Sequence, residues 1–342
     1  KSMKKILFIG IDFSKSKFDA SLLKSMSDEE VVSGSFENNR GGYVLFLKWV
    51  SDHTRIKKED WLFCGEHTGL YSRDLAEFLS KKNLTVWLEN PYQIKCSCGI
   101  KRAKTDKIDA LEIARYAYRF QDKCTPYQPV DKAIESLSLL LSYRGRLIKE
   151  KVLLEVSAKE TRRVISRDTT SRFVFENSMR NIERIKKEIK AVEEKMHQIL
   201  MDSPLKENYL LTVSVKGIGL VTAVALIVHT NNFSTFNTAR QLACYCGVVP
   251  FEKSSGTSLN RGKHISHLAN RELKTLLTLC ARCAIEHDKE LNVYYHKKLS
   301  EGKEYKVIIN NVRNKLIHRI YAVVTHKMPY MENYLNPFRE CA

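Results

Sequence analysis

The sequence predicts an α/β domain followed by two mostly helical regions. Strand-like and helical segments alternate over the first third, a long heptad repeat occupies the middle, and helical spacing dominates the last third. Hydrophobic residues make up 43% of the 342 residues, which is enough to build more than one core. We therefore expect three domains, at residues 3–130, 131–205 and 206–342.

Apolar runs and helical periodicity give the first third the order β-β-β-α-β-α-β-α. The predicted strands are residues 5–11, 18–23, 31–36, 61–64 and 84–88, and the predicted helices are 42–53, 70–82 and one that begins near Asp106. The short spacing of the first three strands indicates an antiparallel meander. This element order is typical of a ribonuclease-H-like sheet.

The middle third predicts two long helices that form an antiparallel hairpin. The second helix carries a heptad seam made of Ile182, Ile185, Ile189, Val192, Met196 and Ile199. A less regular stripe runs from Leu137 to Val152, and residues 167–171 break the pattern between the two. The seam could close the hairpin internally or join two chains as a coiled coil. We favour the dimer, because a basic, protruding hairpin has little else to cover its apolar stripe.

The last third predicts helices at 221–229, 238–246 and 267–287, and two more between 289 and 327. The polar stretch 251–264 is expected to be a loop. The Lys-Gly-Ile-Gly run at 216–219 resembles a helix-hairpin-helix turn, whose amides could hold a phosphate. A plain turn between helices explains this run as well.

The composition limits the class of partner. Lys and Arg exceed Asp and Glu by 18, and residues 206–342 hold half of this excess. Such a charge favours a polyanion, meaning nucleic acid or an anionic membrane surface. No apolar run is long enough to span a membrane and no signal peptide is evident, so we expect a cytoplasmic protein. The odd number of cysteines, nine, favours free buried thiols over disulfides or zinc sites.

Four carboxylates stand where a metal site could form. Asp12 ends the first strand, Glu66 follows the fourth, and Asp106 and Asp109 lie three residues apart at a helix start. Each alone could be a solvated terminus. Together they suit Mg²⁺ ions, which assist phosphodiester cleavage. We interpret Asp19 as a surface strand residue.

Basic residues accompany two parts of the chain. The helix start is flanked by Lys101, Arg102, Lys104 and Lys107, which are either solvated or in contact with phosphates. Ser254, Ser255 and Gly256 are accompanied by Lys253, Arg261, Lys263, Arg271 and Lys274. By composition this is a mobile basic loop, but a serine there could attack phosphorus if cations and metal stabilise the charge.

Several motifs together match one family. They are Gly10-Ile11-Asp12, Glu66-His67-Thr68-Gly69-Leu70-Tyr71, Lys104-Thr105-Asp106-Lys107-Ile108-Asp109-Ala110, Gly217-Ile218-Gly219 and Ser255-Gly256. In this order they resemble the transposases of the insertion sequence 110 family, the bridge-RNA-guided recombinases related to Piv-type DNA invertases. The second and third motifs are similar to the family's Glu-Ala-Thr-Gly-x-Tyr and Lys-Thr-Asp-x-x-Asp-Ala.

The resemblance implies a RuvC-like nuclease domain, a coiled-coil middle and a C-terminal transposase domain. It implies a DEDD site for Mg²⁺ at Asp12, Glu66, Asp106 and Asp109, and a nucleophile at Ser255 that forms a phosphoserine link to DNA. The implied partners are donor and target DNA, a structured bridge RNA, and further copies of the chain in a dimer or a synaptic tetramer. Such an enzyme would act at the nucleoid of a bacterial or archaeal cell.

Two other functions remain open on the residues alone. A RuvC-like structure-specific endonuclease would need only the four acids, and a non-catalytic nucleic-acid-binding protein would need neither acids nor serine. A covalent protein–DNA adduct separates the recombinase from the endonuclease. Sugar kinases and actin-like ATPases also open on Gly-Ile-Asp, but they need a second Asp-x-Gly phosphate loop, which this sequence lacks.

Overall fold

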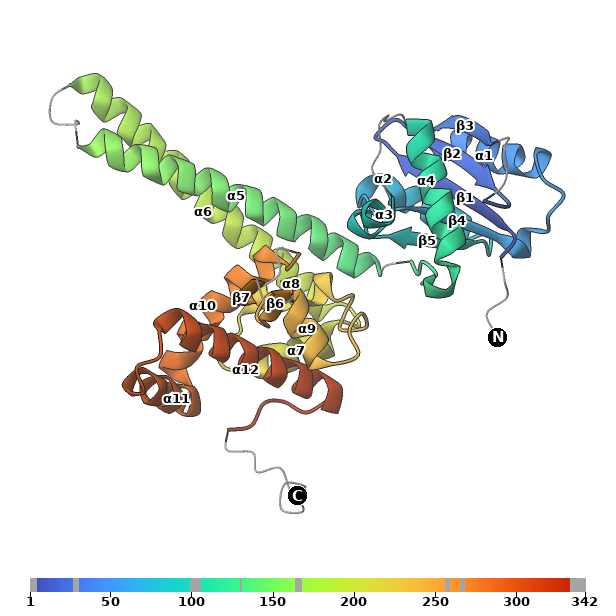
Figure 1. The fold of residues 1–342 in the computed structure, drawn as a ribbon. Helices are drawn as coiled ribbons and strands as arrows, with labels where there is room; N and C mark the ends of the chain where they lie inside the picture. The colour runs from blue at the N-terminus through green and yellow to red at the C-terminus, as the bar shows by residue number, and fades with distance from the viewer. Residues whose placement is uncertain are drawn as a thin grey trace, which may run out of the picture. The chain divides into compact units, whose positions relative to one another are not determined.

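The computed structural model describes residues 5–26, 31–98, 106–129, 131–163, 168–255, 259–264 and 268–332. Contacts within the chain divide it into two compact units, Lys1–Pro129 and Val130–Ala342 (Figure 1). The division into three domains stays a prediction.

The first unit is built on a five-stranded mixed sheet with the order β3-β2-β1-β4-β5. The strands are β1 (Leu7–Phe13), β2 (Lys17–Leu23), β3 (Val32–Glu37), β4 (Trp61–Glu66) and β5 (Thr85–Glu89). β2 runs antiparallel to both β1 and β3, whereas β1, β4 and β5 run parallel. The predicted meander is confirmed, and the mixed sheet is consistent with a RuvC-like fold.

Helices cover both faces of this sheet (Figure 1). They are α1 (Arg40–Asp52), α2 (Leu70–Ser80), α3 (Pro91–Ser97) and α4 (Asp106–Arg119), with short 3₁₀ turns at Lys58–Asp60 and Gln121–Lys123. Alternate residues of β1 point to opposite faces. Ile9 and Ile11 join the cluster under α1 and α2, and Phe8 joins the one under α3 and α4.

A glycine brings α4 onto the sheet. A Cβ at Gly10 of β1 would clash with the carbonyl oxygen of Ala110 and the backbone nitrogen of Ala114, both in α4. No other residue type fits at this crossing without moving the helix. Gly10 therefore fixes how closely the first half of α4 approaches the end of β1.

The second unit begins with the predicted helical hairpin, formed by α5 (Lys132–Arg162) and α6 (Thr169–Met201), which lie side by side (Figure 1). The prediction that the heptad seam of α6 joins two chains is wrong. Ile185, Ile189 and Val192 of α6 are buried within this chain, in one cluster with the apolar stripe of α5. The predicted break is also too long, because α6 already begins at Thr169.

Six more helices complete the described part of the second unit. They are α7 (Lys206–Ser214), α8 (Leu220–His229), α9 (Ala239–Tyr245), α10 (Arg271–His287), α11 (Lys289–Ser300) and α12 (Tyr305–His326). One hydrophobic core joins α8, α10 and α12 to the base of the hairpin. None of the helices in the described ranges is both long and apolar enough to cross a membrane.

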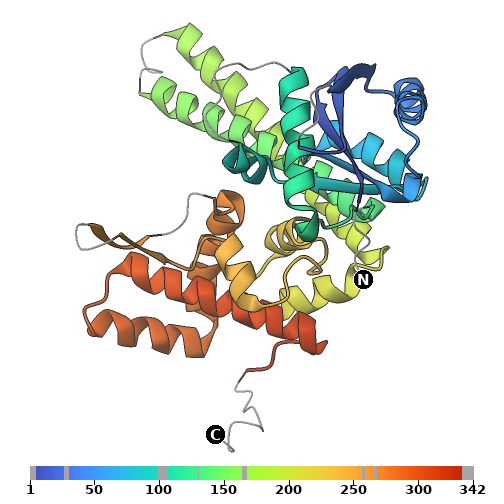
Figure 2. The same ribbon diagram turned by 45° about the vertical axis from the view of Figure 1, so that its right-hand side comes forward.

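The stretch 251–264, expected as a loop, contains two strands instead. β6 (Phe251–Ser255) pairs antiparallel with β7 (Leu259–His264), and the register shifts between Glu252 and Ser254 (Figure 2). The sequence hides these strands because most of their residues are polar, so no alternation of apolar and polar positions marks them. Ser255 is thus the last residue of a strand, paired with Leu259.

Candidate active site

Asp12 and Glu66 come from neighbouring strands at the same edge of the sheet. β1 and β4 pair in parallel up to Ile11 and Gly65, so the next residue of each strand is an acid. Ile11 and a Cβ on Gly65 both point toward the face covered by α1 and α2. Since side chains alternate along a strand, Asp12 and Glu66 share the other face, the one that α4 covers.

α4 brings two more acids toward this face. Asp109 is half-buried and directly precedes Ala110, the residue that touches Gly10. Asp106 is the first residue of α4, and its side chain lies outside the described part. In the described part, no group of three or more His, Cys, Asp or Glu side chains is arranged to hold a metal ion.

A fifth acid, Glu89, was missed by the sequence analysis. It ends β5 and pairs in register with Glu66 of β4. Its carboxylate accepts hydrogen bonds from the Tyr116 hydroxyl of α4 at 3.1 Å and from the Asn90 amide at 2.6 Å. Burial, and then the Glu89 charge, raise the pKa of Tyr116 above its ordinary value. The rule that selected Asp12 and Glu66, an acid at a strand end, would also have found Glu89.

We had expected Asp19 to be a surface residue, but it is buried. It stands directly across from Asp12 in the antiparallel pairing of β1 and β2, and only 5% of its surface is exposed. Cross-strand partners share a face, so its carboxylate lies on the same side of the sheet as Asp12. An ion pair with Lys17, at 3.3 Å, balances its charge.

The cations predicted to flank the acids cannot be placed. Lys101, Arg102 and Lys104 lie outside the described residues, as does the side chain of Lys107, whose backbone belongs to α4. Their contact with phosphates stays a prediction.

The second group of predicted residues surrounds the β6–β7 hairpin. Ser254, Ser255 and Lys253 belong to β6, and Arg261 and Lys263 to β7; their side chains lie outside the described part. Arg271 and Lys274 lie in the first turns of α10, with Arg271 exposed and Lys274 half-buried. The hairpin is anchored at its exit, where the Asn270 amide donates to the Tyr245 carbonyl at 2.8 Å.

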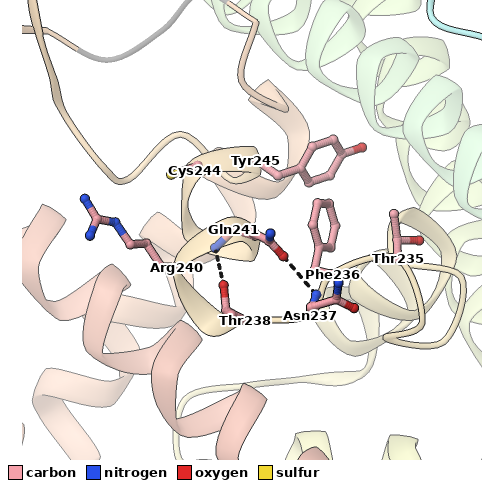
Figure 3. Close-up of a pocket in the computed structure, with 8 residues that line it drawn as sticks. All are labelled: Thr235, Phe236, Asn237, Thr238, Arg240, Gln241, Cys244 and Tyr245. Atoms are coloured by element: carbon pink, nitrogen blue, oxygen red, sulfur yellow. Dashed lines mark hydrogen bonds between the residues drawn. The ribbon is translucent and has the colours of Figure 1, made fainter. Parts of the chain in front are cut away.

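A shallow hollow of about 610 Å³ lies beside this anchor, between residues 235–238 and α9 (Figure 3). The Phe236 and Tyr245 rings line one side, with centroids 5.1 Å apart. Thr238 caps α9 by accepting from the Gln241 amide at 3.2 Å, and the Gln241 side chain accepts from the Asn237 amide at 2.9 Å. These bonds fix the shape of the hollow, which suits a surface contact better than an enclosed substrate.

The turn between α7 and α8 has a packing explanation. Gly217 has φ of 87°, and a Cβ there would lie 2.7 Å from the Cys280 carbonyl oxygen of α10. Glycine is therefore needed for both its conformation and its size. Lys216 forms an ion pair with Glu332, so this turn does not by itself indicate a phosphate site.

The described cysteines are free thiols, but the prediction that they are buried holds only for Cys64, Cys246 and Cys280; Cys96 and Cys283 are exposed. Burial raises the pKa of Cys246 to about 12 and also raises that of Cys280. The Cys280 thiol lies 3.1 Å from the Thr222 hydroxyl, which ties α10 to α8. These thiols serve packing.

Comparisons with known proteins match both units. A family model of DEDD transposases of the IS110 type matches residues 9–161, and a model of the transposase family IS116/IS110/IS902 matches residues 210–296. The pilin gene-inverting protein of Moraxella bovis is 28% identical over 332 residues, covering 94% of this chain and 97% of its own length. The transposase of insertion element IS1533 from Leptospira borgpetersenii is 23% identical and covers 70% of this chain and 73% of its own length.

The mixed sheet and these matches define a DNA-recombining enzyme of the transposase and invertase class. Within that class, the chain belongs to the IS110 family of transposases. The similarity to the pilin gene-inverting protein covers 94% of this chain, so it includes both units.

Proposed function

We propose that this transposase is an RNA-guided DNA recombinase that cuts and joins strands through an acid site and a serine. The observation that carries the proposal is the edge of the first sheet. Asp12 and Glu66 lie side by side near the ends of neighbouring parallel strands, on the face that α4 approaches at Gly10. Membership of the IS110 family supports the same reading.

Asp12, Glu66, Asp106 and Asp109 are the residues proposed to hold Mg²⁺. Carboxylate oxygens are the donors that this hard cation prefers, and the set includes no sulfur or nitrogen ligand. Bound Mg²⁺ would supply positive charge to the oxygens of the phosphodiester. Glu89 holds α4 against the strand ends through Tyr116, and so would fix the position of Asp109.

Ser255 is the proposed nucleophile. Its Oγ would form a bond to phosphorus while a P–O bond of the DNA strand breaks, and the serine proton would end on the leaving oxygen. A serine hydroxyl needs help to do this at neutral pH. We propose that the acid site of one protomer and Ser255 of another act on the same phosphodiester, within a dimer or a synaptic tetramer.

A structured bridge RNA is the proposed source of target choice. The net charge of +18 suits binding to nucleic acid backbones, and the sequence has no zinc finger or comparable base-reading motif. We expect RNA to co-purify with the protein and to raise its affinity for DNA. Undiminished binding and recombination of the enzyme's own target after complete nuclease treatment would refute RNA guidance.

The covalent intermediate gives the sharpest test of the chemistry. Ser255→Ala should abolish the protein–DNA adduct that denaturing gels detect after incubation with Mg²⁺, while DNA binding is kept. Ser254→Ala, one residue earlier, is the matched control and should still form the adduct. An adduct formed by Ser255→Ala would exclude this nucleophile, and strand cleavage with no adduct in the wild type would favour the endonuclease.

A further inference from the structure

Arg313 of α12 is a buried cation for which the described residues offer no counter-charge. Its side chain is only 9% exposed, and its Nε has no hydrogen-bond partner. Burial lowers the pKa of the Arg313 guanidinium, although it stays charged at neutral pH. Within the described residues it forms no ion pair with any carboxylate. An unpaired buried charge is costly, so its retention calls for an explanation.

A second arginine of the same helix, Arg319, is paired with acids, as partly buried arginines usually are. Arg319 donates to Asp288 at 2.8 Å and to Glu290 at 2.6 Å. Its guanidinium also lies 4.9 Å from the centre of the Tyr330 ring. The fold therefore supplies acids to a half-buried arginine two turns away, whereas no acid in the described part of the chain pairs with Arg313.

Another cation, Lys274, lies on α10, the helix that packs against α12. Burial, and then the Arg313 charge, lower the pKa of Lys274 on α10. Lys274 also forms no ion pair among the described residues. Two neighbouring positive charges repel each other, and partial burial strengthens that repulsion. An anion bound between Lys274 and Arg313 would offset both their mutual repulsion and the cost of burying their charges.

These cations sit where the β6–β7 hairpin joins the helices. On the entry side, the Asn310 amide of α12, one turn before Arg313, donates to the Val248 carbonyl at 2.8 Å. On the exit side, Asn270 bonds to Tyr245 and caps α10 by accepting from the Leu273 amide at 3.0 Å. Lys274 is the next residue of α10. Both ends of the hairpin are thus fastened beside the two cations.

We propose that Lys274 and Arg313 form a binding site for a backbone phosphate of the DNA strand, next to the hairpin that carries Ser255. A guanidinium and an ammonium can bind one phosphate together. That the strand is the one being cleaved rests on the proposed role of Ser255. The phosphate site itself rests on Arg313 and Lys274.

A first experiment measures the site with inorganic phosphate alone. Phosphate should raise the thermal midpoint of the wild type more than sodium chloride of equal ionic strength does, and should not do so for Arg313→Met. Without ligand, Arg313→Met should melt about 2–4 °C higher, because it replaces an unpaired buried charge by an apolar side chain of similar length. A lower midpoint for Arg313→Met, or the same response to phosphate, would overturn the proposal.

A second experiment measures binding of a labelled DNA duplex in EDTA, where neither Mg²⁺ nor cleavage contributes. Arg313→Met should weaken binding about tenfold and reduce the slope of log K against log salt by about one phosphate contact. Arg313→Lys, which keeps the charge, should keep most of the slope. Lys306→Gln removes an exposed cation from the same helix and is the control for net charge alone.

Two results of the second experiment would count against the site. An equal effect of Lys306→Gln would mean that only net charge matters. A loss seen with an RNA hairpin but not with the DNA duplex would reassign the phosphate to RNA. Because no cleavage is measured, a failure of the serine mechanism leaves both tests interpretable.

Discussion

The two units each contain a cluster of like charges, and the two clusters have opposite sign. At the edge of the first sheet, Glu66 and Glu89 end β4 and β5, and Asp12 is the next-to-last residue of the neighbouring parallel strand β1. In the second unit, Lys274 and Arg313 stand together without an acid among the described residues. Folded proteins rarely keep like charges together unless something else binds there. The difference supports two separate proposals, a cation bound at the acid edge of the first unit and a phosphate bound beside Arg313 in the second.

The largest effect is expected at the acid edge. Asp109→Asn keeps the size of the side chain but removes one of the proposed metal-binding charges, so Mg²⁺-dependent strand cleavage should be lost. Glu112→Gln, one turn along α4 in a residue paired with Arg115 at 2.7 Å, should stay close to wild type. The check is cleavage of a labelled target with thermal melting of both variants. Full activity of Asp109→Asn would remove this residue from the site.

The second unit should lose the most stability when charged residues replace apolar ones in the core of the α5–α6 hairpin. Ile189→Glu with Val192→Glu places two carboxylates at positions that are 9% and 8% exposed. Burial of unpaired charge should destabilise this unit by several kcal/mol in urea unfolding. Lys187→Glu, on the exposed side of α6, should change little. A double variant that stays folded but halves the mass in light scattering would restore the dimer seam.

A smaller effect should distinguish positioning from metal binding at Glu89. Glu89→Ala and Tyr116→Phe both break the hydrogen bond that holds α4, and should weaken Mn²⁺ binding about tenfold in calorimetry. Glu89→Gln keeps an acceptor and should bind Mn²⁺ as the wild type does. Glu77→Ala on α2 is the charge control. Equal losses for Gln and Ala would make Glu89 a metal ligand itself.

The smallest expected effect is on the pH dependence of stability, through Glu272, an acid of the second unit that is paired with His229. The hydrogen bond from His229, at 3.2 Å, lowers the pKa of the Glu272 carboxyl in the folded state. A lowered pKa stabilises the fold above the ordinary carboxyl pKa, and this contribution is lost as the pH falls through the acidic range. Glu272→Gln should flatten that part of the pH profile by less than about 1 kcal/mol, since the pair is half-exposed. An unchanged profile in urea unfolding from pH 7 to 4 would show that the pair contributes nothing.

The sequence revealed the features that depend on local pattern. β1 and β4 are apolar runs that end at Asp12 and Glu66, so both strands and their acids could be predicted. Asp19 could not, because its burial depends on the register between β1 and β2. The heptads of α6 look the same whether they pack within a chain or between chains. Arg313 was hidden because its burial depends on how α12 packs against the other helices of the second unit.

The central claim, that the acid edge and Ser255 are halves of one active site supplied by different protomers, has one direct test. Asp109→Asn and Ser255→Ala should each be inactive alone with guide RNA and Mg²⁺. Mixed in equal amounts, they should recover strand cleavage and the covalent adduct, because a mixed oligomer contains an intact acid edge facing an intact serine. A mixture as inactive as its components, with light scattering confirming mixed oligomers, would contradict the account.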